Sequence, residues 1–117
     1  MINSRLFALE AHVHFSEQVA TVTEIIETEN SSIAIWGVRP GQIVQAHLHP
    51  DGQDTWVMLR GTLTYYLGNG QSQILNAGEV AIAEKNQIHG AVNDHSEDAL
   101  FVSIYSAPQI GYEQASP

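Results

Sequence analysis

Two histidines, His47 and His49, are separated by one residue within an apolar run, Ile43 to His49, that is typical of a β-strand. Because side chains alternate along a strand, both imidazoles point to one face and can reach the same metal ion. Asp54 follows a turn-forming segment, residues 50–53, that can bring its carboxylate back toward the pair. His89 lies on a later strand-like run and can supply a third imidazole. These four residues are the predicted metal ligands.

The predicted ligands are nitrogen and oxygen atoms only, since the chain has no cysteine. Three neutral imidazoles and a carboxylate suit one divalent transition metal ion, and Fe, Mn, Ni, Zn, Co and Cu all accept such ligands. The sequence therefore predicts a metal site without identifying the metal. The absence of cysteine also excludes disulfides, thiolate metal sites and a cysteine nucleophile.

Alternatives to this ligand set remain open. Gln53 competes with Asp54 as the fourth ligand, although neighbours on a strand face opposite ways and this favours Asp54. His12 and His14 form a second His-x-His pair. No carboxylate or third histidine follows them at a matching interval, so a solvent-facing strand is the preferred interpretation there. On spacing alone, histidines that bind no metal are the default interpretation.

Short β-branched and aromatic runs, separated by turn residues, must position these side chains. Such a pattern indicates an all-β sandwich or barrel. On the run that follows Asp54, Trp56 and Met58 share its face and should line the interior. The turn at Gly68-Asn69-Gly70 supplies the positive φ angles of a tight hairpin. The predicted strands are Val19–Glu27, Ser31–Val38, Ile43–His49, Thr55–Leu59, Thr62–Leu67, Gln71–Leu75, Glu79–Ala83, Ile88–Val92 and Ala99–Tyr105.

Two spaced motifs resemble those of the cupin superfamily. The first motif of that family is Gly, five residues, His-x-His, three or four residues, Glu, six residues, Gly, and here Gly41, His47, His49, Asp54 and Gly61 keep the spacing with Asp in place of Glu. The second is Gly, five residues, Pro-x-Gly, two residues, His, three residues, Asn. Its positions are Gly78, Glu84-Lys85-Asn86, His89 and Asn93, without the Pro and the Gly. Asn tolerates left-handed turn geometry nearly as well as Gly, so Asn86 can replace the lost Gly.

The resemblance implies a cupin-type double-stranded β-helix, a jelly-roll barrel, as a single domain over residues 1–117. It also implies a homodimer, because small cupins commonly pair their N-terminal strands. The leading functional hypothesis is a metal-dependent isomerase, lyase, decarboxylase or dioxygenase that acts on a small-molecule substrate such as a sugar or keto acid. The alternative is a non-catalytic module that binds or senses a small ligand. A metal-free structural remnant is disfavoured by the complete ligand spacing.

Charge and composition exclude some classes of binding partner. The net charge of -9 repels phosphate groups, so neither nucleic acid nor an anionic membrane surface is an expected partner. The apolar residues 6–9 are too few for a signal-peptide core and lack a basic head, and no later stretch reaches membrane-spanning length. We therefore expect a cytoplasmic protein. The tail after Pro108 is expected to fray.

Overall fold

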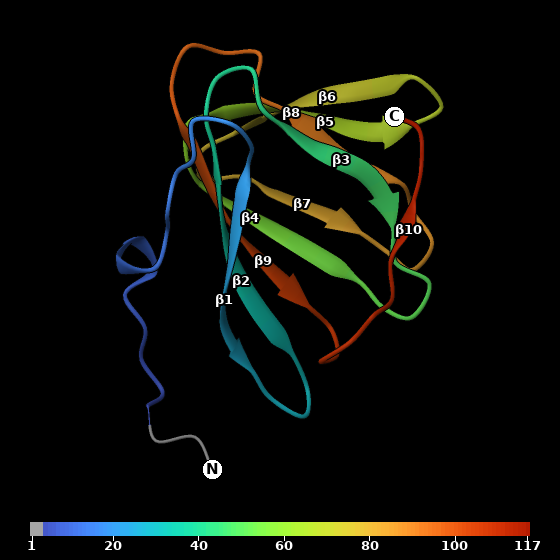
Figure 1. Cartoon of the computed structure of the whole chain (residues 1–117). Coiled ribbons are helices and arrows are strands. Elements are labelled where there is room, and N and C mark those ends of the chain that lie inside the picture. Colours follow the sequence, from blue (N-terminus) through green and yellow to red (C-terminus); the bar gives the residue numbers. More distant parts are fainter. Residues whose placement is uncertain (1–3) are drawn as a thin grey trace.

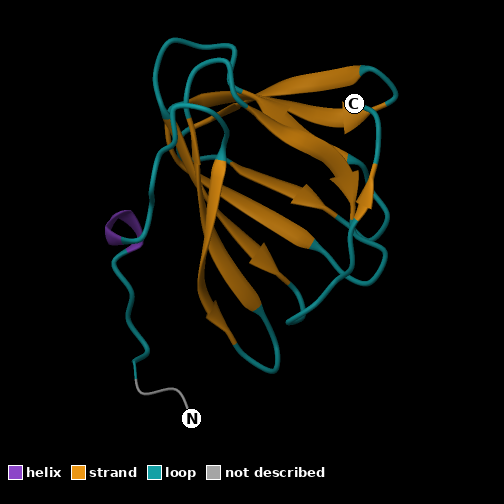
Figure 2. Cartoon of the chain, in the orientation of Figure 1, coloured by secondary structure: helices purple, strands orange, loops and turns teal. Residues whose placement is uncertain are grey.

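The computed structural model describes residues 4–117, and its regular secondary structure is almost entirely β-strand (Figures 1 and 2). All nine strands predicted between residues 19 and 105 are present, and their ends differ from the prediction by no more than two residues. No helix within residues 4–117 is long and apolar enough to cross a membrane. Residues 1–3 of the predicted domain lie outside the described residues. The elements are η1 (Leu9–Ala11), β1 (Thr21–Glu27), β2 (Ser32–Val38), β3 (Ile43–Leu48), β4 (Asp54–Arg60), β5 (Thr62–Gly68), β6 (Gln71–Asn76), β7 (Val80–Ala83), β8 (His89–Val92), β9 (Ala99–Tyr105) and β10 (Glu113–Gln114).

Two five-stranded antiparallel sheets make up the fold. One has the order β1-β2-β9-β4-β7 and the other has the order β10-β3-β8-β5-β6. Figure 1 shows them as two layers that converge at one end. Consecutive strands therefore alternate between the sheets in several places, as in a jelly roll. The predicted all-β double-stranded β-helix is confirmed.

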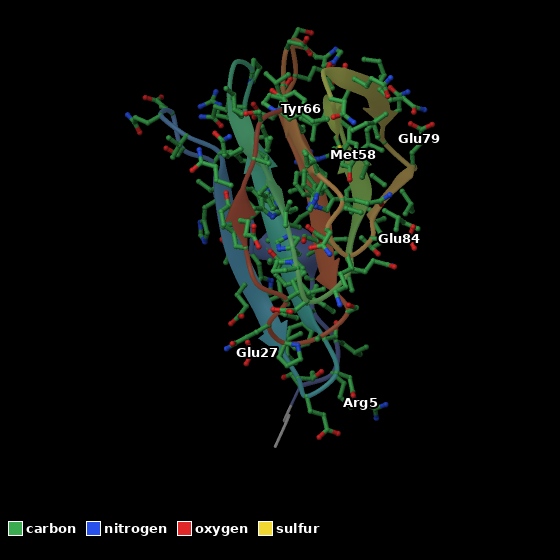
Figure 3. The ribbon with its side chains drawn as sticks, turned by 90° about the vertical axis from the view of Figure 1, so that its right-hand side faces the viewer. Arg5, Glu27, Met58, Tyr66, Glu79 and Glu84 are labelled. Atoms are coloured by element: carbon green, nitrogen blue, oxygen red, sulfur yellow. The ribbon has the colours of Figure 1, made fainter. Side chains whose placement is uncertain are left out.

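The core lies between the sheets and is built around stacked aromatic rings. The Trp56 ring stacks on Phe101 with centroids 4.0 Å apart, and Trp36 stacks on the other side of Phe101 at 5.8 Å. Trp56 and Met58 are each 1% exposed, which confirms that the face they share with Asp54 points inward. In Figure 3, Met58 lies among the packed side chains, whereas Glu79 and Glu84 lie at the periphery. Asp54 thus begins a strand whose inner face is otherwise apolar.

A β-bulge in β3 places His47 on the inner face. Val44 pairs with Ala91 and His47 pairs with His89, so three steps on β3 oppose two steps on β8. Val44, Ala46 and His47 are consequently all buried, although strict alternation would have turned His47 outward. Gly90 lies opposite this bulge, where a Cβ atom would come within 2.7 Å of the Val44 carbonyl oxygen. Gly90 therefore allows the two strands to approach.

The C-terminal tail does not fray, and this corrects the prediction. Ile110 is 2% exposed, and its carbonyl oxygen accepts a hydrogen bond from the Asp51 backbone N–H at 2.9 Å. Beyond it, β10 pairs antiparallel with β3 (Figure 1). The predicted N-terminal strand around His12 and His14 is also wrong, because these residues follow η1 in irregular structure.

Candidate metal centre

The structure brings the four predicted ligands together. His47 lies on β3, His49 follows its end, Asp54 opens β4 and His89 opens β8. One potential ligand atom from each of the four lies within 4.8 Å of those of the others, and all four residues are buried. The Gln53 amide instead donates to the Thr55 hydroxyl at 3.3 Å. Both sheets therefore contribute to one compact group of three imidazoles and a carboxylate.

Each imidazole is oriented by a backbone carbonyl. The Nδ1 atoms of His47, His49 and His89 lie 2.6, 2.6 and 3.0 Å from the carbonyl oxygens of Gln45, Gly111 and Gln87. A carbonyl oxygen only accepts hydrogen bonds, so each Nδ1 carries the proton and donates it. In the neutral imidazoles, Nε2 then keeps its lone pair, which is the arrangement of a metal-binding histidine.

Asp54 is held in place by two donors. Its Oδ1 accepts a hydrogen bond from the Ser103 hydroxyl at 2.7 Å, and its Oδ2 accepts one from the Trp56 indole N–H at 3.0 Å. The same Oδ2 lies 3.0 Å from His89 Nε2 and 3.5 Å from His49 Nε2. Ser103 was not predicted as a site residue. The sequence feature that could have indicated Ser103 is its hydroxyl within the apolar run of β9, on the same face as Phe101.

The electrostatics of the group favour an anionic carboxylate. Burial alone would raise the pKa of Asp54, but the facing imidazoles of His49 and His89 and the hydrogen bond from the Ser103 hydroxyl hold that pKa well below its usual range. Burial also opposes charging of His49, yet the Asp54 carboxylate and the Gly111 carbonyl raise the pKa of His49 above 6.5. Burial, aided by the neighbouring His89 and His49, lowers the pKa of His47 to about 4. At neutral pH the group therefore combines a carboxylate with a neutral His47.

Aromatic rings surround the group. Tyr112 stacks on His47 with centroids 4.9 Å apart and an interplanar angle of 20°. Tyr105 lies 5.1 Å from the His49 ring, and Trp56 lies edge-on to His89 at 5.9 Å. Burial, together with the Asp54 charge, raises the pKa of Tyr105 to about 12, so its phenol keeps its proton at neutral pH. The C-terminal residues Gly111 and Tyr112 were not predicted to take part, since no strand pattern marks them.

The donor atoms fit a divalent transition metal ion. Among the described residues, the Nε2 atom of His49 is the one buried side-chain polar atom without a hydrogen-bond partner. Its lone pair faces an acceptor, the Asp54 carboxylate, rather than a donor. A cation between these atoms would satisfy both, and imidazole and carboxylate ligands suit several divalent transition metals. The four side chains could therefore hold such an ion.

The second histidine pair lies apart from this group. The His12 Nδ1 atom donates to the Ala8 carbonyl oxygen at 2.9 Å, within the N-terminal segment. His14 is exposed, and neither residue belongs to a potential metal-binding group within residues 4–117. Nothing in the structure therefore makes this pair a second centre.

Comparisons with known proteins find a matching family model and a similar solved structure. Residues 34–105 match the family model described as "Cupin domain". A Klebsiella pneumoniae protein with a double-stranded β-helix domain is 36% identical, and the match covers 98% of this chain and 100% of that one with a TM-score of 0.94. No protein in the curated set matches the sequence.

More distant solved structures share the fold. Oxalate oxidase is 19% identical with a TM-score of 0.78, and the match covers 94% of this chain and 63% of that one. KdgF from Halomonas sp. is also 19% identical, with a TM-score of 0.75 over 90% of this chain and 95% of that one. At this level of identity the two similarities concern the fold alone.

Proposed function

The chain belongs to the cupin family, and from this premise we propose that it is a metal-dependent enzyme for a small oxygenated metabolite. It binds one divalent transition metal ion through His47, His49, Asp54 and His89. The reaction is an isomerisation, a lyase reaction or an oxygenation of a sugar, a keto acid or a related compound. Residues 1–117 act together as one catalytic domain.

The observation that carries this proposal is the common orientation of the three histidines. All three donate Nδ1–H to carbonyl oxygens, so three lone pairs and a carboxylate share a buried space. Leaving a buried polar atom without a partner costs about 1–3 kcal/mol. One dication removes this cost for His49 Nε2, the one such atom among the described residues, whereas an ordinary polar core would pair donors with acceptors.

The charge of the site supports an anionic or oxygen-rich substrate. Three neutral imidazoles and one carboxylate would leave a bound dication with about one net positive charge. When bound, the ion would supply Lewis acidity toward a chelating oxygen atom. The Ser103 hydroxyl would help to keep Asp54 ionised, Trp56 would hold its carboxylate in place, and Tyr105 would keep a phenol proton near His49. One of the structures with this fold, oxalate oxidase, is named for a small dicarboxylate.

A hollow lies next to residues that flank the centre, although none of the four ligands lines it. It has a volume of about 370 Å³, lies between β5 and the segment after β7, and is lined in part by Tyr65, Ile82 and Asn86. Tyr65 packs edge-on against Trp56 at 5.2 Å, and Trp56 in turn contacts His89. We propose that the substrate approaches the metal from this side of the barrel.

The test begins with elemental analysis of protein purified without added metal. The protein should contain a single transition metal near one equivalent per chain. The metal-loaded protein is then screened against keto acids, sugar acids and catechols, with His49→Ala as the inactive control. Turnover that depends on the metal and is lost in His49→Ala supports the enzyme. Tight binding of a compound without turnover would instead support a non-catalytic binding module, and protein that takes up no metal would contradict both.

A further inference from the structure

We propose that the C-terminal segment Ile110–Gln114 positions and covers two of the ligands of the metal centre. Gly111 orients His49 from outside the barrel strands, and Tyr112 covers His47, so the segment sets how long a metal ion is retained. This inference rests on the proposed function, because it concerns the same four ligands. It assigns positioning residues that neither family motif contains.

The segment is fixed on both sides of Gly111. On one side, Ile110 is buried and fills the space beside Gly52, where an added Cβ atom would lie 2.2 Å from the Ile110 side chain. On the other side, β10 pairs with Leu48 and His47, and the Ala115 N–H donates to the Ala46 carbonyl oxygen at 2.9 Å. Gly111 itself has a φ of +73°. A Cβ atom there would lie 2.8 Å from the Pro50 ring, so its backbone position is tightly defined.

His49 depends on this segment in a way that the other two histidines do not. His47 and His89 donate Nδ1–H to carbonyl groups two residues earlier in their own strand regions. His49 donates instead to Gly111, which is 62 residues away along the chain. A partner on the far nitrogen fixes the tautomer and the ring orientation of a ligand histidine and raises its basicity. The C-terminal segment therefore controls one ligand directly.

Tyr112 acts on a second ligand. Its ring lies nearly parallel to His47 at 4.9 Å, while 57% of the tyrosine is exposed and His47 is only 5% exposed. One face of the tyrosine ring thus covers the imidazole, and the rest of the residue meets water. Removing the ring would open the centre to water and chelators at the β10 edge of its sheet. The hollow beside Tyr65 lies toward the opposite edge, which is formed by β6.

The full-length protein loaded with Co²⁺ tests this inference through metal release into excess chelator. Loss of an outer partner of a ligand histidine weakens metal binding about 10- to 100-fold. Gly111→Ala, which displaces the carbonyl partner of His49, should therefore release Co²⁺ about 10-fold faster than the wild type or more. Tyr112→Ala, which uncovers His47, should also release Co²⁺ faster than the wild type. Gly111→Ala should also shift the visible Co²⁺ absorption, because the His49 ring changes its orientation. Tyr112→Phe keeps the ring and should restore slow release.

A matched control is Tyr66→Ala, which removes a partly exposed tyrosine from β5, away from the group, and should not accelerate release. Tyr112 lies at the surface, so Tyr112→Ala remains informative if Gly111→Ala does not fold. Wild-type release rates in both Gly111→Ala and Tyr112→Ala would overturn the inference and leave the proposed function intact. A wild-type protein that binds no Co²⁺ would overturn both.

Discussion

Replacement of Ser103 by alanine should weaken metal binding without touching a ligand. The Ser103 hydroxyl donates to Asp54 Oδ1 at 2.7 Å, and the serine is 2% exposed. Hydrogen bonds to charged groups contribute about 1.5–3 kcal/mol, so the metal-free protein should lose stability in that range. Because this hydrogen bond lowers the pKa of Asp54, its loss should also raise that pKa and let the carboxylate turn.

The expected effect on metal affinity is about 10- to 100-fold, or about 1.4–2.8 kcal/mol, as for other groups that orient metal ligands. Affinity is measured by competition with a chromophoric chelator, and stability by urea unfolding of the metal-free protein. Ser31→Ala is the matched control. The Ser31 hydroxyl donates to the Tyr105 carbonyl oxygen at 2.8 Å. The Ser31→Ala variant should therefore lose about 0.5–1.5 kcal/mol of stability but no metal affinity. Equal metal affinity in Ser103→Ala and the wild type would refute the role assigned to this hydroxyl.

Two further predictions follow from the same geometry, and a third follows from the resemblance to small cupins. Asp54→Ala should keep a larger share of its metal than His49→Ala, because three oriented imidazoles remain, but it should lose activity. Elemental analysis measures the metal content, and a turnover assay measures the activity. Gln53→Ala is the control and should change neither the metal content nor the activity. The raised pKa of His49 stabilises the metal-free fold below pH 6.5, and this contribution is lost as the pH rises through the folded pKa. Since metal must displace this proton, the increase in Tm on metal addition should be smaller at about pH 5.5 than at about pH 8. The chain should form a homodimer, and light scattering that gives only 12.8 kDa would contradict this.

Much of the fold could be predicted because local signals agree with it. Runs of β-branched and aromatic residues end at Gly and Asn turns, and these turns have the required geometry, as the positive φ values of Asn69 and Asn86 show. Asp54 could be preferred over Gln53 because it shares the inner face with Trp56 and Met58. At these positions the alternation along the strand and the tertiary contacts predict the same side-chain orientation.

The remaining features depend on contacts that no local pattern encodes. The bulge before His47 resets the alternation of β3, and its opposing Gly90 lies on a different strand. The return of the C-terminal segment is fixed by Ile110 and a two-residue strand, which are too short for a periodic signal. Ser103 could be read as a site residue only once β9 was known to lie beside β4. Long-range packing therefore supplied the outer partners of the predicted ligands.

Titration of the metal-free protein with Co²⁺, followed by its visible absorption, tests the central hypothesis most directly. The wild type should bind one Co²⁺ per chain and develop one spectrum that saturates at that ratio. His89→Ala should bind more weakly and give a different spectrum, because one of three imidazoles is lost from the same ion. Wild-type protein that binds no Co²⁺, or a His89→Ala spectrum identical to that of the wild type, would contradict the assignment of these four residues to a single metal centre.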